Sequence, residues 1–472
     1  MLRSSLSNNQ ATPEQVDTLS FTQQVLPPLR DASDPALSSS PNPQTQPLPK
    51  RTLVSQVWKN AILPYLGTRL VLVSIGLLAT YYVLPLLISN PRLPAFSVNG
   101  AFPQSLWLMW DRFDSGFYLT IARSGYWGAN TLHNRPDWVF YPLYPLLIAG
   151  PARLFGGSSS AFDIVALLIS NISGIIMIVY FYLLVRKDFT SQIAARAVLY
   201  LALFPLAFFL SAIYTESLLL CLSIACIYYT RRQSWWLAGL CGGLAALTRL
   251  QGVALIVPLA WEYLRVTGSR YAPLSGQQSQ RRITRIVSWL RTSFRGLLLA
   301  ARERENWLAG LSLGLVPCGL LAFMVYGQIA IGDFFATFHA SQWGWGRQLS
   351  PPWRLLIYSL RHPILGQPLN WNFWLLNMIA AIAFLAVIFW AFRRLPTAYA
   401  LYTAVTVVLP LSSNSLNSLA RYYLLVFPVF ILLALLTSTD EKQHLHNFIV
   451  AGFAALEAIL MVFFVLGLFV IA

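Results

Sequence analysis

Long apolar runs recur along this chain, separated by short polar or basic stretches. The runs are apolar throughout and do not alternate with a period of two, so they predict helices. Some are long enough to cross a bilayer, which takes about 20 residues. Other runs are short or interrupted. Such spans are typical of helices that end inside the protein beside a polar cavity. The pattern predicts an all-α fold, a polytopic transmembrane helical bundle of about eleven spans. The apolar segments lie, to within about four residues, at 66–89, 164–185, 190–213, 216–230, 235–248, 252–264, 307–331, 372–392, 397–412, 422–437 and 447–471.

Composition supports a membrane protein. Of the 472 residues, 56% are hydrophobic and 11% are charged, whereas soluble domains carry about 25% charged residues. The net charge of +16 does not indicate nucleic acid, because Arg and Lys gather between the apolar runs, where the positive-inside bias places them. The four cysteines lie inside apolar runs without zinc or disulfide spacing, so we interpret them as packing residues.

The first 60 residues differ from the rest of the chain. They are rich in Ser, Pro, Gln and Asn with almost no apolar clustering, which predicts a disordered polar cytoplasmic tail over 1–60. The first apolar span begins too late and is too long for a signal sequence, so we expect no cleaved signal peptide. Residues 61–472 are then the transmembrane domain.

Basic clusters set the expected orientation. All of these clusters lie on the cytoplasmic side if the stretch at 248–252 forms a tight turn at the opposite face of the membrane. The N-terminus is then cytoplasmic and the C-terminus extracytoplasmic. Two extracytoplasmic loops follow, at about 90–163 and about 332–371, both rich in Trp, and we expect interfacial helices in the first. The clusters are Lys50–Arg51 with Lys59, Arg186–Lys187, Arg231–Arg232, Arg393–Arg394 and a basic loop at about 265–305.

The unusual polar residues fall on the outer face in this topology. Ionisable groups at membrane depth are costly and usually face a functional cavity, so a shared face predicts one cavity. These residues are Asp111, Asp114, Glu216, Arg249, Asp333, His339, Gln342 and Arg421, the last preceded by Asn414, Asn417 and Ser418.

Each of these residues also has a structural interpretation, which the sequence leaves open. Asp111 and Asp114 flank an arginine and can pair with it at the interface. Glu216 and Arg249 can form an ion pair between helices, and Arg421 can extend to the headgroups. The lone histidines His133 and His339 fit loop hydrogen bonding better than a ligand role, and the tryptophans fit interface anchors.

Five short motifs follow one another along the chain. They are RFDSGFYLTIARSGY at 112–126, FYPLYP at 140–145, FP at 204–205 with SAIYTESL at 211–218, GLAALTR at 243–249 with a glycine at 252, and SLARY at 418–422 before FP at 427–428. In this order they resemble the motifs of PIG-V-like membrane mannosyltransferases. One departure is Phe113, where that family usually has Trp, and another is the extra Trp110–Asp111 pair upstream. Asp114 aligns with the family aspartate, because only its spacing to Tyr118 and the following motif residues fits.

The resemblance implies a glycosyltransferase of the GT-C class, which takes a sugar from a polyprenyl or dolichyl phosphate on the outer or lumenal face. The expected activity is inverting transfer of a mannose or related hexose to a lipid or glycan acceptor. The polar tail and the loop lengths favour a bacterial plasma membrane over the endoplasmic reticulum. The partners we expect are the lipid bilayer, the polyprenyl-phosphate sugar donor and the lipid or glycan acceptor, without nucleic acid; the sequence does not identify a protein partner.

An inverting transfer needs one carboxylate as general base, for which Asp114 is the first candidate and Asp111 the second. The phosphate leaving group needs cationic donors, for which Arg249 and Arg421 are suited. Further substrate-binding candidates are Glu216, Tyr118, Tyr141, Gln342, Trp343 and Trp345.

No cofactor is required by this scheme. A divalent metal held by Asp111 and Asp114 stays open, although no diagnostic metal spacing is present. The main alternative function is a transporter or flippase of lipid-linked sugars, which would have paired broken helices in two similar halves. The sequence shows no internal repeat of fixed period. A non-catalytic subunit of a glycosylation complex is a third interpretation.

Overall fold

The computed structural model describes residues 50–88, 100–126, 136–271, 303–362, 368–416 and 418–468. Within these ranges every regular element is a helix, which confirms the all-α class for the described part of the chain. Most of the predicted tail and of the predicted basic loop lie outside the described residues, as do His133 and Asn417.

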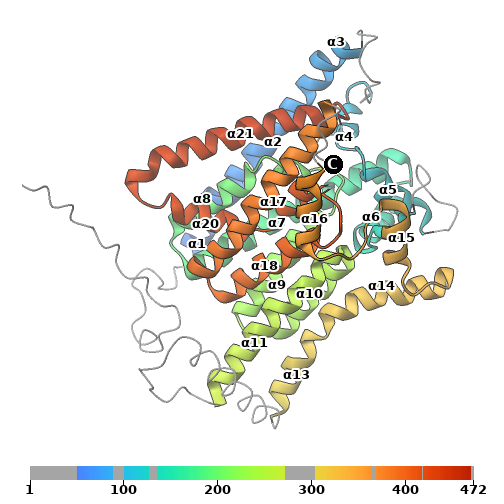
Figure 1. Cartoon of the computed structure of the whole chain (residues 1–472). Helices are drawn as coiled ribbons and strands as arrows, with labels where there is room; N and C mark the ends of the chain where they lie inside the picture. Colours follow the sequence, from blue (N-terminus) through green and yellow to red (C-terminus); the bar gives the residue numbers. More distant parts are fainter. Residues whose placement is uncertain are drawn as a thin grey trace, which may run out of the picture. The chain divides into compact units, whose positions relative to one another are not determined.

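The helices follow one another through short connections. In chain order they are α1 (Lys50–Val57), the π-helix η3 (Trp58–Ile62), α2 (Leu63–Leu78), the π-helix η4 (Ala79–Val83), α3 (Leu84–Ile88), α4 (Ser105–Leu108), α5 (Ser115–Ser124), the 3-10 helix η5 (Asp137–Val139), α6 (Leu143–Leu154), α7 (Ser159–Asp188), α8 (Ser191–Ala202), the 3-10 helix η6 (Ala207–Leu210), α9 (Glu216–Arg231), α10 (Trp235–Thr248), the 3-10 helix η7 (Leu250–Leu255), α11 (Ile256–Tyr271), α13 (Arg304–Leu313), α14 (Leu315–Ile331), α15 (Ala336–Trp345), α16 (Pro352–Arg361), α17 (Pro368–Arg394), α18 (Thr397–Leu411), α19 (Leu419–Tyr423), α20 (Pro428–Leu436), the 3-10 helix η8 (Asp440–Lys442) and α21 (Gln443–Val465) (Figure 1).

Several helices have the length and composition of membrane spans. Among the described residues four qualify, at Arg51–Leu86, Ser159–Asp188, Asn377–Arg394 and Asp440–Val465. A fifth span arises if Asn306–Leu313 and Leu315–Ile331, bent by 41° at their junction, count as one. The chain is therefore an integral membrane protein, and the count of about eleven spans stays a prediction.

Two predicted segments are each divided in the structure. The segment at 190–213 breaks after Ala202 and continues as a short 3-10 helix, because Pro205 has no backbone N–H to continue the helix. The guanidinium of Arg69 satisfies the backbone at this break, donating to the carbonyls of Ala202 at 2.6 Å and Ala207 at 2.7 Å. The segment at 422–437 likewise divides into α19 and α20 before Pro428. Both breaks place polar chain ends inside the bundle.

Small residues let α10 approach both α13 and α14 closely (Figure 1). A Cβ added to Gly239 would lie 2.1 Å from the carbonyl oxygen of Ser312, and one added to Gly319 would lie 2.2 Å from the carbonyl oxygen of Gly243. Such contacts are typical of helix packing in membranes. They fix α10, whose C-terminal end leads into the site described below.

Candidate functional site

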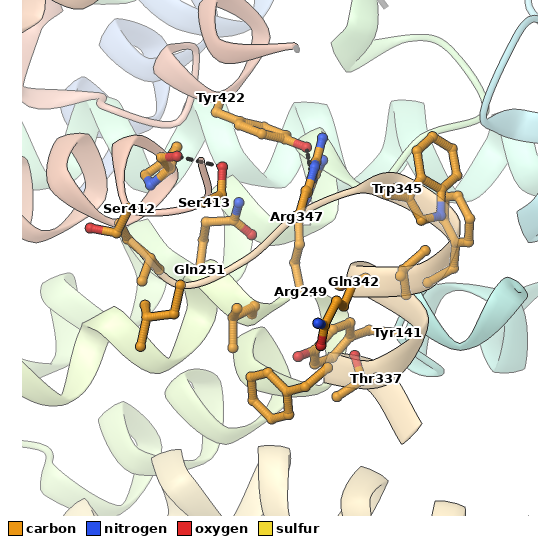
Figure 2. A pocket seen from close by; sticks show the side chains of 18 of the residues that line it. Tyr141, Arg249, Gln251, Thr337, Gln342, Trp345, Arg347, Ser412, Ser413 and Tyr422 are labelled. Carbon is orange, nitrogen blue, oxygen red and sulfur yellow. Dashed lines mark hydrogen bonds between the residues drawn. The ribbon is translucent and has the colours of Figure 1, made fainter. Parts of the chain in front are cut away.

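A cavity of about 510 Å³ lies where several helices end. It is bordered by the start of α5, the end of α10, the length of α15, the end of α18 and α19. Figure 2 shows side chains from α15, from α19 and from the segments that directly follow α10 and α18 around it. Its polar lining comprises Asp114, Tyr118, Tyr141, Thr248, Arg249, Gln251, Thr337, Ser341, Gln342, Trp345, Arg347, Gln348, Ser412, Ser413, Arg421 and Tyr422.

Four charged side chains form a continuous ionic chain at the cavity wall. Nη2 of Arg421 donates to Oδ2 of Asp114 at 2.9 Å. Nε of Arg421 lies 3.4 Å from Oε1 of Glu216, and Nη1 of Arg249 donates to the same oxygen at 2.6 Å. Two carboxylates and two guanidinium groups balance in charge, which offsets the cost of burying them. The side chains of Glu216 and Arg421 are 0% and 2% exposed, whereas that of Asp114 is 19% exposed and faces the cavity.

The turn after α10 places Arg249. The helix ends at Thr248, Arg249 is extended with φ −168° and ψ 152°, and the N–H of Gly252 donates to the Arg249 carbonyl at 2.9 Å. A Cβ at Gly252 would lie 2.2 Å from the backbone of Ala245, so no larger residue fits here. The turn required by the predicted topology is present at this position, and its geometry directs Arg249 toward α9.

The start of α9 positions Glu216. It is the first residue of that helix, where the N-terminal end of the helix dipole favours a carboxylate. Asp114 in turn immediately precedes α5. Its free oxygen, Oδ1, makes no hydrogen bond within the described part of the chain, so it can accept a proton from a bound hydroxyl.

Sequence reasoning missed Arg347 and Tyr422. Nη1 of Arg347 donates to the hydroxyl of Tyr422 at 2.7 Å (Figure 2). The guanidinium groups of Arg249, Arg347 and Arg421 lie 4.8, 5.5 and 5.5 Å from the centre of the Tyr422 ring. Arg347 has no carboxylate partner among the described residues, so it adds a net positive charge to the cavity. The only signal for Arg347 in the sequence was its position as an arginine in the Trp-rich loop at about 332–371, which was predicted to lie on the outer face.

The structure brings together most of the predicted substrate-binding residues. Tyr118, Tyr141, Gln342 and Trp345 all line the cavity. Two other candidates do not line it. Glu216 is 0% exposed, and Trp343 is 77% exposed and stacks on His339.

Asp111 also lies apart from the cavity lining. Its Oδ1 accepts a hydrogen bond from the Ser115 hydroxyl at 2.6 Å, while Asp114 pairs with Arg421. Among the described residues no group of three or more His, Cys, Asp or Glu side chains could hold a metal ion.

The family comparison bears on the centre of this site. Residues 134–275, which include Glu216 and Arg249, match the family model of the dolichyl-phosphate-mannose-protein mannosyltransferases. This match supports a membrane glycosyltransferase of the GT-C type. No curated protein sequence matches the chain.

The similar solved structures are archaeal. The crystal structure of the Archaeoglobus fulgidus oligosaccharyltransferase in complex with zinc and sulfate is 16% identical, with a TM-score of 0.36, over 85% of this chain and 52% of that chain. The archaeal oligosaccharyltransferase AglB of Archaeoglobus fulgidus, in complex with an inhibitory peptide and a dolichol-phosphate, is 14% identical, with a TM-score of 0.37, over 85% and 55%. The chain spans about half the length of these proteins.

Proposed function

We propose that this protein transfers a mannose or related hexose from a polyprenyl-phosphate or dolichyl-phosphate donor to a hydroxyl of a lipid or glycan acceptor. The observation that carries the proposal is the ionic chain Asp114–Arg421–Glu216–Arg249 beside a cavity with one further cation, Arg347. A carboxylate with a free oxygen supplies a base, and the arginines supply partners for a phosphate. The five motifs described above support a PIG-V-like subtype.

The proposed reaction is a single inverting displacement. Oδ1 of Asp114 takes the proton of the acceptor hydroxyl as its oxygen bonds to the anomeric carbon. The bond from that carbon to the phosphate oxygen breaks, and the leaving phosphate gains negative charge. Two groups are suited to bind it: Arg347 and Nη1 of Arg421, a buried nitrogen that has no hydrogen-bond partner in the described structure.

The shape of the cavity fits a donor whose tail stays in the bilayer. The apolar side of the lining is formed by Leu250, Phe338, Leu349, Leu409 and Pro410. Leu349 is 94% exposed, so this apolar side opens outward. A polyprenyl chain can leave along it while the sugar and the phosphate occupy the polar side.

Helix α9 supports an extracytoplasmic site. Glu216 is its first residue and Arg231 its last, so the ionic chain and the basic cluster are separated by roughly 22 Å along the helix axis. Because basic clusters favour the cytoplasmic side, the cavity belongs to the opposite face. We assign the protein to the plasma membrane of a bacterium.

The test compares purified wild type with Asp114→Asn and Asp111→Asn, supplied with a short-chain polyprenyl-phosphate mannose and a lipid extract. Transfer or slow donor hydrolysis by the wild type and by Asp111→Asn, but not by a folded Asp114→Asn, supports the proposal. If activity is lost in Asp111→Asn but kept in Asp114→Asn, the general base is Asp111. No consumption of donors with several sugars, together with movement of lipid-linked sugar across liposome membranes, refutes the transferase and favours the flippase.

A further inference from the structure

Tyr214 bridges the two sides of the loop that carries Asp114. The residue is fully buried just before α9. Its hydroxyl donates to the carbonyl of Arg112 at 2.8 Å and accepts from the backbone N–H of Asp114 at 3.2 Å. One phenol thus binds the residues on both sides of Phe113, and phenylalanine in its place can make neither hydrogen bond.

The bridged loop has an unusual backbone. Phe113 has φ +53°, in the left-handed region that a non-glycine residue rarely adopts. Such a conformation persists only where the surroundings hold it. The hydroxyl of Tyr214 does so from one side, and the carbonyl of Val465 in α21 accepts from Nε of Arg112 at 3.0 Å on the other.

Tyr214 also contacts the partner of the proposed base. The guanidinium of Arg421 lies 5.2 Å from the centre of the Tyr214 ring. The same side chain therefore orients the backbone of Asp114 and supports Arg421, to which the Asp114 carboxylate is paired.

We propose that Tyr214 is a positioning residue that sets the direction of the Asp114 carboxylate toward the cavity. It acts through Asp114 and does not itself touch the substrate, since it is absent from the cavity lining. The inference rests on the proposed function, in which Asp114 is the base. It predicts that losing the hydroxyl slows turnover while substrate binding is kept.

The chain offers a matched control in Tyr144. This tyrosine is equally buried, and its hydroxyl also makes two hydrogen bonds, to the carbonyl of Ala166 at 3.0 Å and to the hydroxyl of Ser170 at 2.8 Å. Tyr144→Phe therefore removes a comparable buried hydroxyl without touching the loop at 112–114.

The experiment compares Tyr214→Phe with Tyr144→Phe in two measurements. The first is hydrogen exchange of a peptide covering 111–117, where the Asp114 amide loses its acceptor only in Tyr214→Phe and exchange should accelerate. The second is steady-state transfer, where Tyr214→Phe should lower kcat by roughly 10- to 100-fold with donor KM nearly unchanged. Tyr144→Phe should change neither quantity.

Equal exchange and equal kcat in the two variants would overturn the inference. If the wild type itself turns over no donor, the proposed function fails, and hydrogen exchange still decides whether Tyr214 holds the loop. If Tyr214→Phe does not fold, hydrogen exchange in the wild type provides the test, because the Asp114 amide that donates to the Tyr214 hydroxyl should be protected. Rapid exchange of that amide in the folded wild type would also overturn the inference.

Discussion

Removing the charge of Glu216 should destabilise the protein more than removing any exposed carboxylate. In Glu216→Gln the side chain keeps its shape, but Arg249 and Arg421 then face a neutral amide, 0% exposed, and the four-residue ionic chain changes from neutral to +1. At distances of 2.6 and 3.4 Å, each attraction is about 5–6 kcal/mol before desolvation at an effective dielectric constant of about 20. Net losses on breaking a buried pair are about 3–5 kcal/mol.

Thermal unfolding in detergent measures this loss. We expect the Tm of Glu216→Gln to fall by on the order of 5–10 °C. Asp333→Asn, which breaks the exposed Asp333–His339 pair, should change it by about 1 °C or less. The double variant Glu216→Gln with Arg249→Gln removes one charge of each sign, so it should be more stable than the sum of the single losses by about 1–3 kcal/mol.

Two results would refute the reasoning. A Glu216→Gln variant as stable as the wild type would mean that Glu216 is not the charged centre of the ionic chain. Additive losses in the double variant would mean that Glu216 and Arg249 do not interact. Either result would remove the structural basis for a preorganised phosphate site.

Three further predictions follow from the same region and its surroundings. Gly252→Ala should lower the Tm strongly, since its Cβ would lie 2.2 Å from backbone atoms, whereas Gly67→Ala, with open space around it, should not. Arg347→Gln should weaken donor binding by about 10- to 100-fold, measured as donor affinity, and Arg354→Gln on α16, outside the cavity lining, should not; equal losses would exclude a phosphate role for Arg347. Burial raises the pKa of Asp137 from 3.8 to about 6, so the native state binds its proton more tightly and stability falls as the pH rises through this window. Asp137→Asn should therefore have a higher Tm than the wild type at about pH 7.5 but not at about pH 4, and equal Tm values at both would contradict the shift.

The sequence was most informative about charged residues in apolar segments, because the free-energy cost of burying a charge makes such residues rare unless they have a role. Charged groups within apolar runs are expensive, so Glu216 and Arg249 stood out and were expected to share a cavity. Their ion pair, first considered as a purely structural alternative, joins Arg249 in the cavity lining to Glu216, which is buried behind it. Under the proposed function this structural pair also supports the phosphate site.

The pattern was least informative in the loops. Trp343 and Trp345 are two positions apart in α15, so they point to different sides of the helix, and composition cannot tell which side faces a cavity. Only Trp345 lines it. Asp111 and Asp114 are separated by the left-handed Phe113, and no periodicity predicts the direction of a side chain across such a residue. Arg347 lies in an irregular connection for which the sequence has no positional rule.

The ion pair between Asp114 and Arg421 joins residues 307 positions apart. A nascent chain is made from its N-terminus and folds in that order, so the first loop, α9 and α10 exist before the ribosome reaches residue 421 of 472. Until then Asp114 has no cationic partner, and the cavity lacks the wall supplied by α19. A chain that ends before α19 therefore cannot assemble the site, and under the proposed function donor consumption would begin only after this late segment has been made.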